Sequence, residues 1–258
     1  IMLVGISLGI LQQITGINAI YFYATSIFKQ TGIGTDAAFS SGVLLSFTTV
    51  VFTLIAIYLI DRMGRRPLLL VGMSGIAVSL LLCAYSFSQA TYELSATEIN
   101  SFENIDNYKL AEFQDINYDS DVTFKNEIKA AIGNQVYALN EGAILEAAID
   151  MNATLVLIGI LGFIACFAFS LGPVMWVMLS EIFPNRYRGL AIGVIGFINS
   201  FSSWLIQQIF PWEISNLGSA LTFFIYGLIA TVGMLLFIKI LPETKGKSLE
   251  EIETELIK

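Results

Sequence analysis

The stretch Gln12-Gln-Ile-Thr-Gly-Ile-Asn-Ala-Ile-Tyr-Phe-Tyr23 places three amide side chains inside an apolar run that lasts from residue 1 to about residue 28. Hydrocarbon offers no water to satisfy an amide, so Gln12, Gln13 and Asn18 must face the interior of a helix bundle or a wet cavity. On a regular helix the side chains of Gln13 and Asn18 point about 140° apart. They share one face only if the helix opens, and Gly16 is the position where it can.

Two interpretations of these amides stay open at this point. They hydrogen-bond neighbouring membrane helices to each other, or they bind a ligand at an interrupted helix near the middle of the membrane, where transporters hold their substrates. Both interpretations place this stretch inside a membrane bundle.

The composition of the chain indicates a protein that crosses a membrane several times, because 55% of its 258 residues are hydrophobic. Twelve acids and three lysines fall within 90–151, so this segment has a charge of −9 and the remainder only +1. This distribution resembles no nucleic-acid-binding surface. The chain has no histidine, and Cys83 and Cys166 both lie in apolar runs. We therefore expect no metal site, cofactor or disulfide.

Six apolar stretches are long enough to cross a bilayer, which predicts an all-α membrane protein built as a six-transmembrane-helix bundle. They are about 1–28, 38–60, 68–89, 152–180, 189–211 and 218–241. The predicted organisation is three spans in 1–89, an acidic extracytoplasmic insert at 90–151, three spans in 152–241 and a tail at 242–258. Within the insert we expect a loose leading segment and then a helical cap from Phe124 to Asp150. The insert is a solvated excursion, or it has a role in partner binding or substrate access.

The short connections between spans predict the orientation, since lysine and arginine favour the cytoplasmic side. They cluster in 61–67, in 181–188 and in the tail, whereas the opposite short loops hold only Lys29. The termini of this segment are therefore expected in the cytoplasm, and the insert outside. The first span starts at residue 1 without a charged leader, so we expect a further N-terminal part.

The connection Asp61-Arg-Met-Gly-Arg-Arg-Pro67 is more specific than positive charge alone requires. Its arginines can reach a carboxylate on a neighbouring element, and Ser180-Glu-Ile-Phe-Pro184 supplies one. We predict that Glu181 pairs with Arg65 or Arg66.

Polar and aromatic groups also occur at mid-depth in the fourth and fifth spans. Gly172-Pro173 permits a kink and precedes Trp176 by about one turn, while Asn199, Ser203 and Gln207 form one helical stripe. Trp176 is either a residue at the membrane interface or an aromatic floor for a ligand. Amides and aromatics without a buried charge suit a neutral polyhydroxy substrate.

Five segments together resemble the C-terminal half of sugar porters of the major facilitator superfamily, which includes glucose transporters and bacterial xylose–proton symporters. They are Gln12-Gln-Ile-Thr-Gly-Ile-Asn18, Asp61-Arg-Met-Gly-Arg-Arg66, Gly172-Pro-Val-Met-Trp176, Ser180-Glu-Ile-Phe-Pro184 with Arg188-Gly189, and Pro242-Glu-Thr-Lys-Gly246. The resemblance covers all six spans and leaves out only the insert. It implies that the spans are helices seven to twelve of a twelve-helix transporter, whose N-terminal six-helix half is a partner of this one.

The resemblance also implies roles for individual residues. Those expected to bind the sugar are Gln12, Gln13, Asn18, Trp176, Asn199 and Phe167. Those expected at the gate are Phe22 and Tyr23, together with the Gly172-Pro173 kink. Those expected in a cytoplasmic charge network are Asp61, Arg62, Arg65, Arg66, Glu181, Arg188 and Glu243. Leu45, Ser200 and Phe22 depart from residues that are common in the family, which leaves the identity of the sugar open.

The expected function is transport of a monosaccharide, a hexose or a pentose, by alternating access, as uniport or proton symport. A coupling proton is expected to pass through the N-terminal half, since we place no acid in the membrane core of this segment. The alternatives are a porter for another neutral polyol such as inositol and a non-transporting membrane sugar sensor. An enzyme is not expected, because no nucleophile–base pair or metal cluster is visible. The expected location is the plasma membrane or a bacterial inner membrane.

Overall fold

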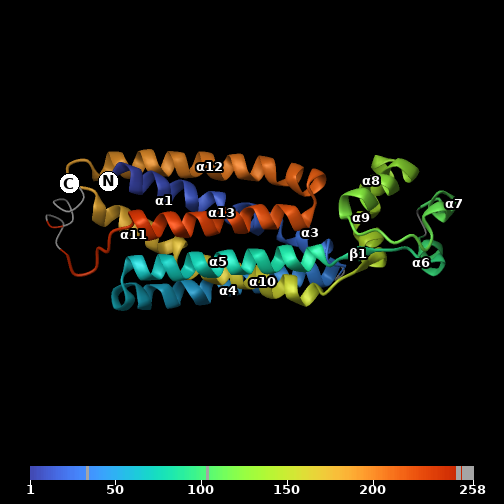
Figure 1. Cartoon of the computed structure of the whole chain (residues 1–258), viewed down its shortest axis with the longest axis horizontal. Coiled ribbons are helices and arrows are strands. Elements are labelled where there is room, and N and C mark those ends of the chain that lie inside the picture. Colours follow the sequence, from blue (N-terminus) through green and yellow to red (C-terminus); the bar gives the residue numbers. More distant parts are fainter. Residues whose placement is uncertain (33–34, 103–104, 248–250, 252–258) are drawn as a thin grey trace.

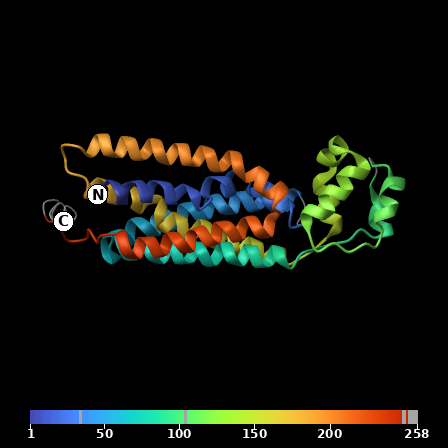
Figure 2. The same ribbon diagram turned by 45° about the horizontal axis from the view of Figure 1, so that its top comes forward.

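The computed structural model describes residues 1–32, 35–102, 105–247 and 251. It shows a long helical bundle with a smaller unit projecting from one end (Figures 1 and 2). Within the described residues, six helices are long and apolar enough to cross a membrane. The predicted fold class, an all-α six-helix membrane bundle, is confirmed.

Two of the six spans are interrupted. The first consists of α1 (Met2–Ile14), α2 (Ile17–Phe22) and α3 (Ala24–Lys29), and the fourth of α10 (Ala153–Phe169) and α11 (Leu171–Ile182). The other four are single helices: α4 (Thr35–Met63), α5 (Arg65–Ser88), α12 (Arg188–Asn216) and α13 (Ser219–Ile240). Interrupted membrane helices leave backbone groups free to contact a ligand, and transporters place their binding sites there.

Helix α5 is the centre of one layer and packs along α10 and α13. The approach of α10 is close because Gly159 and Gly162 face Cys83 and Ser79 of α5. Small residues at such contacts let membrane helices gain dispersion energy where no hydrophobic effect drives them together. Helix α1 packs instead on α12, α11 and α13, and this second layer contains the amides.

Two predicted connections are shorter than expected. Helix α4 continues to Met63, so only Gly64, at φ 93°, separates it from α5. Helix α12 continues past Pro211 to Asn216, which leaves Leu217 and Gly218 as the connection in place of 212–217. Glu213 consequently lies within a candidate membrane helix, near its end, where the Tyr226 hydroxyl donates to it at 2.8 Å. The fifth predicted span, 189–211, was therefore too short at its end, because α12 includes Glu213.

The insert has a hydrophobic core of its own, so its leading segment is not the loose chain that was expected. It contains β1 (Thr91–Tyr92), α6 (Ala96–Ser101), α7 (Asn107–Leu110), the 3-10 turn η1 (Ala111–Phe113), α8 (Asp121–Ile132), α9 (Asn134–Ala148) and β2 (Ile149–Asp150). A capping box at Ser95 and Glu98 begins α6. Strands β1 and β2 pair antiparallel and close the base of the insert. Tyr92 and Phe124 stack at 5.4 Å in its core.

The N-terminus and the segment after α13 lie at the end of the bundle opposite the insert (Figure 1). Most of the predicted tail, from residue 248 on except residue 251, lies outside the described residues, as do residues 33 and 34 of the first loop.

Candidate functional site

The first span opens at Gly16, the position where the sequence allowed a break. Gly16 is left-handed, with φ 87°, and its N–H donates to the Gln13 carbonyl at 2.9 Å in a tight turn. A side chain at this position would meet the Tyr226 ring of α13, because an added Cβ would lie 2.9 Å from its Cδ1. The turn brings together two side chains that a regular helix would separate. Asn18 Nδ2 donates to Gln13 Oε1 at 2.8 Å.

The amides of α1 form a hydrogen-bonded network with Asn199 of α12. Asn199 Nδ2 donates to Gln12 Oε1 at 2.7 Å and to the Gly9 carbonyl at 2.9 Å. Gln13 Nε2 donates to Asn199 Oδ1 at 3.1 Å. All three amide side chains are buried, so the network removes the cost of unpaired polar groups in the bundle and joins the two helices.

Gln12 also links the two interrupted spans. Its Nε2 donates at 2.9 Å to the carbonyl of Leu171, the first residue of α11. The second interruption lies at Ser170, two residues before the predicted Gly172-Pro173 kink, and the Ser170 hydroxyl donates to the Cys166 carbonyl at 2.6 Å. The predicted kink of this span is therefore present. Pro173 lies in the first turn of α11, where its missing N–H is not needed, so the break falls just before it. The two breaks thus lie next to each other.

A polar recess of about 260 Å³ opens beside this network. It is lined by Gln13, Asn18, Asn199, Ser200, Ser203, Trp204, Gln207 and Gln208. Asn18 Nδ2 donates to Ser203 Oγ at 2.7 Å, while Asn18 Oδ1 accepts no hydrogen bond from any described residue. The recess therefore offers amides and hydroxyls, and its lining residues include no charged side chain.

Trp204 and Gln208 belong to the lining but were not predicted from the sequence. The sequence contains a pattern that could have identified them, because Ser200, Trp204 and Gln208 repeat at every fourth position. This stripe is displaced by one residue from the predicted stripe of Asn199, Ser203 and Gln207. Two adjacent stripes on one helix make a broad polar face.

A second recess, of about 330 Å³ and mostly apolar, contains the predicted residues Phe167, Gly172 and Pro173. It lies between α2, α4, α10 and α11, and Tyr21, Thr49 and Thr53 supply its hydroxyl groups. The structure does not place these predicted residues in the amide recess.

Three further predicted residues, Trp176, Phe22 and Tyr23, do not line the amide recess. Trp176 is 44% exposed, and its Cη2 is 4.0 Å from where a Cβ on Gly196 would lie, one helical turn before Ser200. Phe22 is exposed and lines neither recess, whereas Tyr23 stacks on Phe210 with ring centroids 5.5 Å apart. Leu45, one of the departures from the family, is buried in the core of the bundle.

The predicted pair of Glu181 and Arg65 is present at the end opposite the insert. Arg65 Nη2 donates to Glu181 Oε1 at 2.7 Å, and Arg65 Nε lies 3.1 Å from both carboxylate oxygens. Asp61 adds a weaker contact to Arg65 at 3.2 Å, and Thr244 donates to Glu181 at 2.6 Å. Glu243 accepts the backbone N–H groups of Arg65 and of Arg66, so it caps the N-terminus of α5.

Three arginines of the predicted network form no ion pair with any described acid. Arg62 lies over the Tyr58 ring at 4.0 Å. Arg66 Nη2 donates to the Ile238 carbonyl at 2.7 Å, and Arg188 Nε donates to the Phe183 carbonyl at 3.2 Å. The network of side-chain pairs is therefore smaller than predicted and contains Asp61, Arg65 and Glu181.

Across the described part of the chain, no three His, Cys, Asp or Glu side chains are grouped so that they could hold a metal ion.

Comparison with known proteins gives consistent matches over nearly the whole chain. A family model described as "Sugar (and other) transporter" matches residues 1–103 and 129–256. The chain is 31% identical over 257 residues to the arabinose-proton symporter of Bacillus subtilis (strain 168), covering 100% of this chain and 43% of that protein. It is 27% identical over 259 residues to the D-xylose-proton symporter of Escherichia coli (strain K12), covering 98% of this chain and 40% of that protein.

A solved structure of the proton:xylose symporter XylE bound to 6-bromo-6-deoxy-D-glucose superimposes with a TM-score of 0.69 at 26% identity, covering 99% of this chain and 42% of that one. The chain thus spans less than half the length of the proteins that it matches.

Proposed function

This chain belongs to the sugar (and other) transporter family, and from that premise we propose that it moves a monosaccharide across a membrane by alternating access. Its fold is that of one half of a major facilitator transporter. In the proposal a second six-helix unit forms the opposite wall of the substrate path, and the two units rock about a site at mid-depth. The end with the termini faces the cytoplasm and the insert faces outside.

The observation that supports the proposal most directly is the uncharged recess at the break in the first span. Amide and hydroxyl groups from α2 and α12 face it, and Trp204 supplies an aromatic wall. A neutral sugar matches this lining, because its hydroxyl groups both donate and accept hydrogen bonds and its ring has apolar C–H faces. A charged solute would require a charged partner in the membrane interior.

The residues of the network divide into two roles in this proposal. Gln12, Gln13 and Asn199 use their amide groups on one another and on backbone carbonyls, so they hold the site in shape. Asn18 keeps an acceptor that no described residue uses, and Ser203 lies beside it in the lining. We assign direct contact with the sugar first to Asn18.

The charged end is proposed to act as a latch that favours closure on the cytoplasmic side. Glu181→Ala should then slow the labelling of Ser200→Cys by an impermeant thiol reagent added on the insert side. An unchanged labelling rate would contradict the latch.

Counterflow in proteoliposomes tests the function, with the protein expressed at its full natural length. Labelled D-xylose, L-arabinose and D-glucose are the probes, with myo-inositol as the polyol. We expect saturable exchange of at least one monosaccharide, which Asn18→Ala reduces about tenfold or more through the lost hydrogen bonds. Gln89→Ala is the matched control, since Gln89 is an exposed amide at the end of α5.

If the protein exchanged only inositol, the proposed substrate would be a polyol and not a monosaccharide. Inserted protein that exchanges none of the four probes would refute the transport proposal. Equal effects of Asn18→Ala and Gln89→Ala would refute the assigned site.

A further inference from the structure

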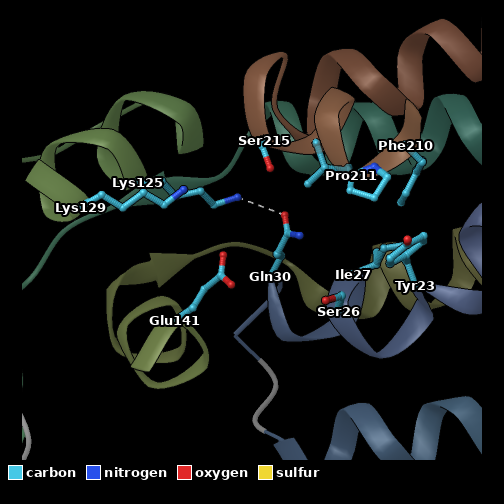
Figure 3. Close-up of a pocket in the computed structure, with 11 residues that line it drawn as sticks. Tyr23, Ser26, Ile27, Gln30, Lys125, Lys129, Glu141, Phe210, Pro211 and Ser215 are labelled. Atoms are coloured by element: carbon cyan, nitrogen blue, oxygen red, sulfur yellow. Dashed lines mark hydrogen bonds between the residues drawn. The ribbon is translucent and has the colours of Figure 1, made fainter. Parts of the chain in front are cut away.

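A third recess lies between the insert and the membrane bundle, away from the amide site. Its volume is about 170 Å³, and both units contribute to its walls (Figure 3). Residues from the bundle are Tyr23, Ser26, Ile27, Gln30, Phe210, Pro211, Ile214 and Ser215, and those from the insert are Lys125, Lys129 and Glu141. An adjoining recess of about 340 Å³ shares Ser26, Gln30 and Glu141 with it. The two together approach the size of small-molecule sites.

The junction that forms this recess is held by buried polar contacts. Lys125 is only 4% exposed, and its Nζ lies 3.2 Å from Asp121 Oδ2 and donates to Gln30 Oε1 at 3.2 Å. The backbone N–H of Ser219, at the start of α13, donates to Asp121 at 3.2 Å, and its hydroxyl donates to Gln30 Oε1 at 2.8 Å. Lys125 and Asp121 pair within α8, and their hydrogen bonds to Gln30 and Ser219 join the insert to the ends of α3 and α13.

One wall of the recess is polar. The Glu141 carboxylate extends into the space below Lys125 and beside Gln30 (Figure 3). Gln30 Nε2 donates to no described residue, although its Oε1 is used twice. Ser26 and Ser215 add hydroxyl groups. Burial, and then the charge of Glu141, raise the pKa of Tyr137, which lies one turn before Glu141 on α9. The wall thus offers a charged acceptor and neutral donors.

The opposite wall is apolar. Tyr23 and Phe210 stack on each other there, next to Pro211. The lysines do not create a surplus of positive charge, because Lys125 pairs with Asp121 and Lys129 faces the same recess as Glu141. Lys129 forms no ion pair with a described acid and lies over the Tyr137 ring at 5.0 Å, so its charge and that of Glu141 balance across the recess. A neutral polyhydroxy ring can donate a hydrogen bond to Glu141, accept one from Lys129 and rest on the aromatic rings.

We propose that this recess is a vestibular monosaccharide site, where sugar binds between the insert and the bundle before it passes Tyr23. The inference rests on the proposed transport function, and it gives the insert a direct role in capturing substrate. Tyr23 follows Asn18 by five residues in the same interrupted span, so a sugar leaving the vestibule past Tyr23 moves toward the amide recess. Glu141 is the principal binding residue of the vestibule.

Saturation-transfer difference NMR with D-xylose and L-arabinose tests the site in an Asn18→Ala background, where the amide recess is impaired. We expect weak binding to persist there and to fall about tenfold with Glu141→Ala, the loss expected for a hydrogen bond to a charged group. Glu146→Ala is the matched control, an exposed carboxylate on the same helix outside both recesses. Glu141→Gln, which keeps the shape of the side chain, guards against a folding defect. Binding equal in the Glu141 and Glu146 variants would overturn the proposal.

Transport kinetics separate this proposal from the general one. Glu141→Gln should raise the KM for influx from the insert side several-fold and leave the KM for efflux unchanged. Equal changes in both directions, or no change in either, would refute the vestibule while the unaltered protein still transports. Absence of counterflow in the unaltered protein would instead refute the transport function.

Discussion

Removal of the Glu181 carboxylate should destabilise the charged end of the bundle by about 2 kcal/mol. Arg65 contacts both carboxylate oxygens through two nitrogens, and the side chains of Arg65 and Glu181 are 13% and 24% exposed. Removing one partner of a fully buried pair costs about 3–5 kcal/mol, and an exposed pair contributes about 0–1 kcal/mol. Partial exposure places Glu181→Ala between these limits. Loss of the acceptor for Thr244 adds to the effect.

Asp61 supplies the matched control, because it contacts the same arginine. Its side chain is 78% exposed and reaches Arg65 through a single contact of 3.2 Å. Water screens the attraction between two exposed charges, so Asp61→Ala should lower the free energy of unfolding by less than about 1 kcal/mol. The comparison keeps the arginine, the region and the charge change constant, and it varies the burial of the carboxylate and the number of its partners.

Thermal unfolding in detergent measures the difference. For a domain of this size about 1 kcal/mol corresponds to about 2–4 °C in Tm, so Glu181→Ala should lower Tm by roughly 4–8 °C and Asp61→Ala by no more than about half as much. Trypsin supplies a local readout, since cleavage after Lys245 should accelerate when Thr244 loses its anchor. Equal Tm shifts in the two variants, or an unchanged rate of cleavage in Glu181→Ala, would refute the reasoning.

Three further substitutions probe the helix break, the junction and the recess. Gly16→Ala should lower Tm, because its left-handed backbone alone costs about 1–2 kcal/mol with a side chain. Lys125→Met should loosen the insert and speed amide hydrogen exchange in α8 and α9, whereas Lys109→Met, on the exposed α7, should not; equal exchange rates would contradict the junction. Trp204→Ala should weaken sugar binding, measured by NMR, about threefold to tenfold through lost aromatic contact. Trp212→Ala is the control, because Trp212 is a similarly exposed tryptophan of the same helix outside the recess.

The position of the break in the first span could be anticipated from the sequence, although its presence could not. Two amides five residues apart share one face only if the helix opens, and Gly16 offers the left-handed turn that joins them. The helix ends were harder to predict. Charged residues near 61–66 are typical of a loop, yet the spacing of Asp61 and Arg65 also suits an i, i+4 pair across Gly64.

The insert shows why contacts between residues that are far apart in the sequence could not be predicted from local patterns. Its leading half has short elements, each with too few residues for a periodic pattern, and they are ordered by a core shared with α8 and α9. The pairing of Thr91 with Asp150 closes this unit across almost sixty residues. Likewise the ion pair of Lys125 and Asp121 is a local i, i+4 contact in sequence, but its partners Gln30 and Ser219 belong to the bundle.

The sequence left open whether the amides join helices or bind a ligand. The geometry favours both roles, carried by different residues. Gln13 Nε2 donates to Gln12 and to Asn199, and Gln13 Oε1 accepts from Asn18. A sugar could not replace these contacts without leaving buried amides unpaired, at a cost of about 1–3 kcal/mol each. Asn18 lies at the rim, with its own acceptor free among the described residues and Ser203 beside it. Gln12, Gln13 and Asn199 thus form a buried network that positions Asn18. In the proposed function, Asn18 can exchange its hydrogen bonds for those of a sugar, so the site can bind and release its substrate.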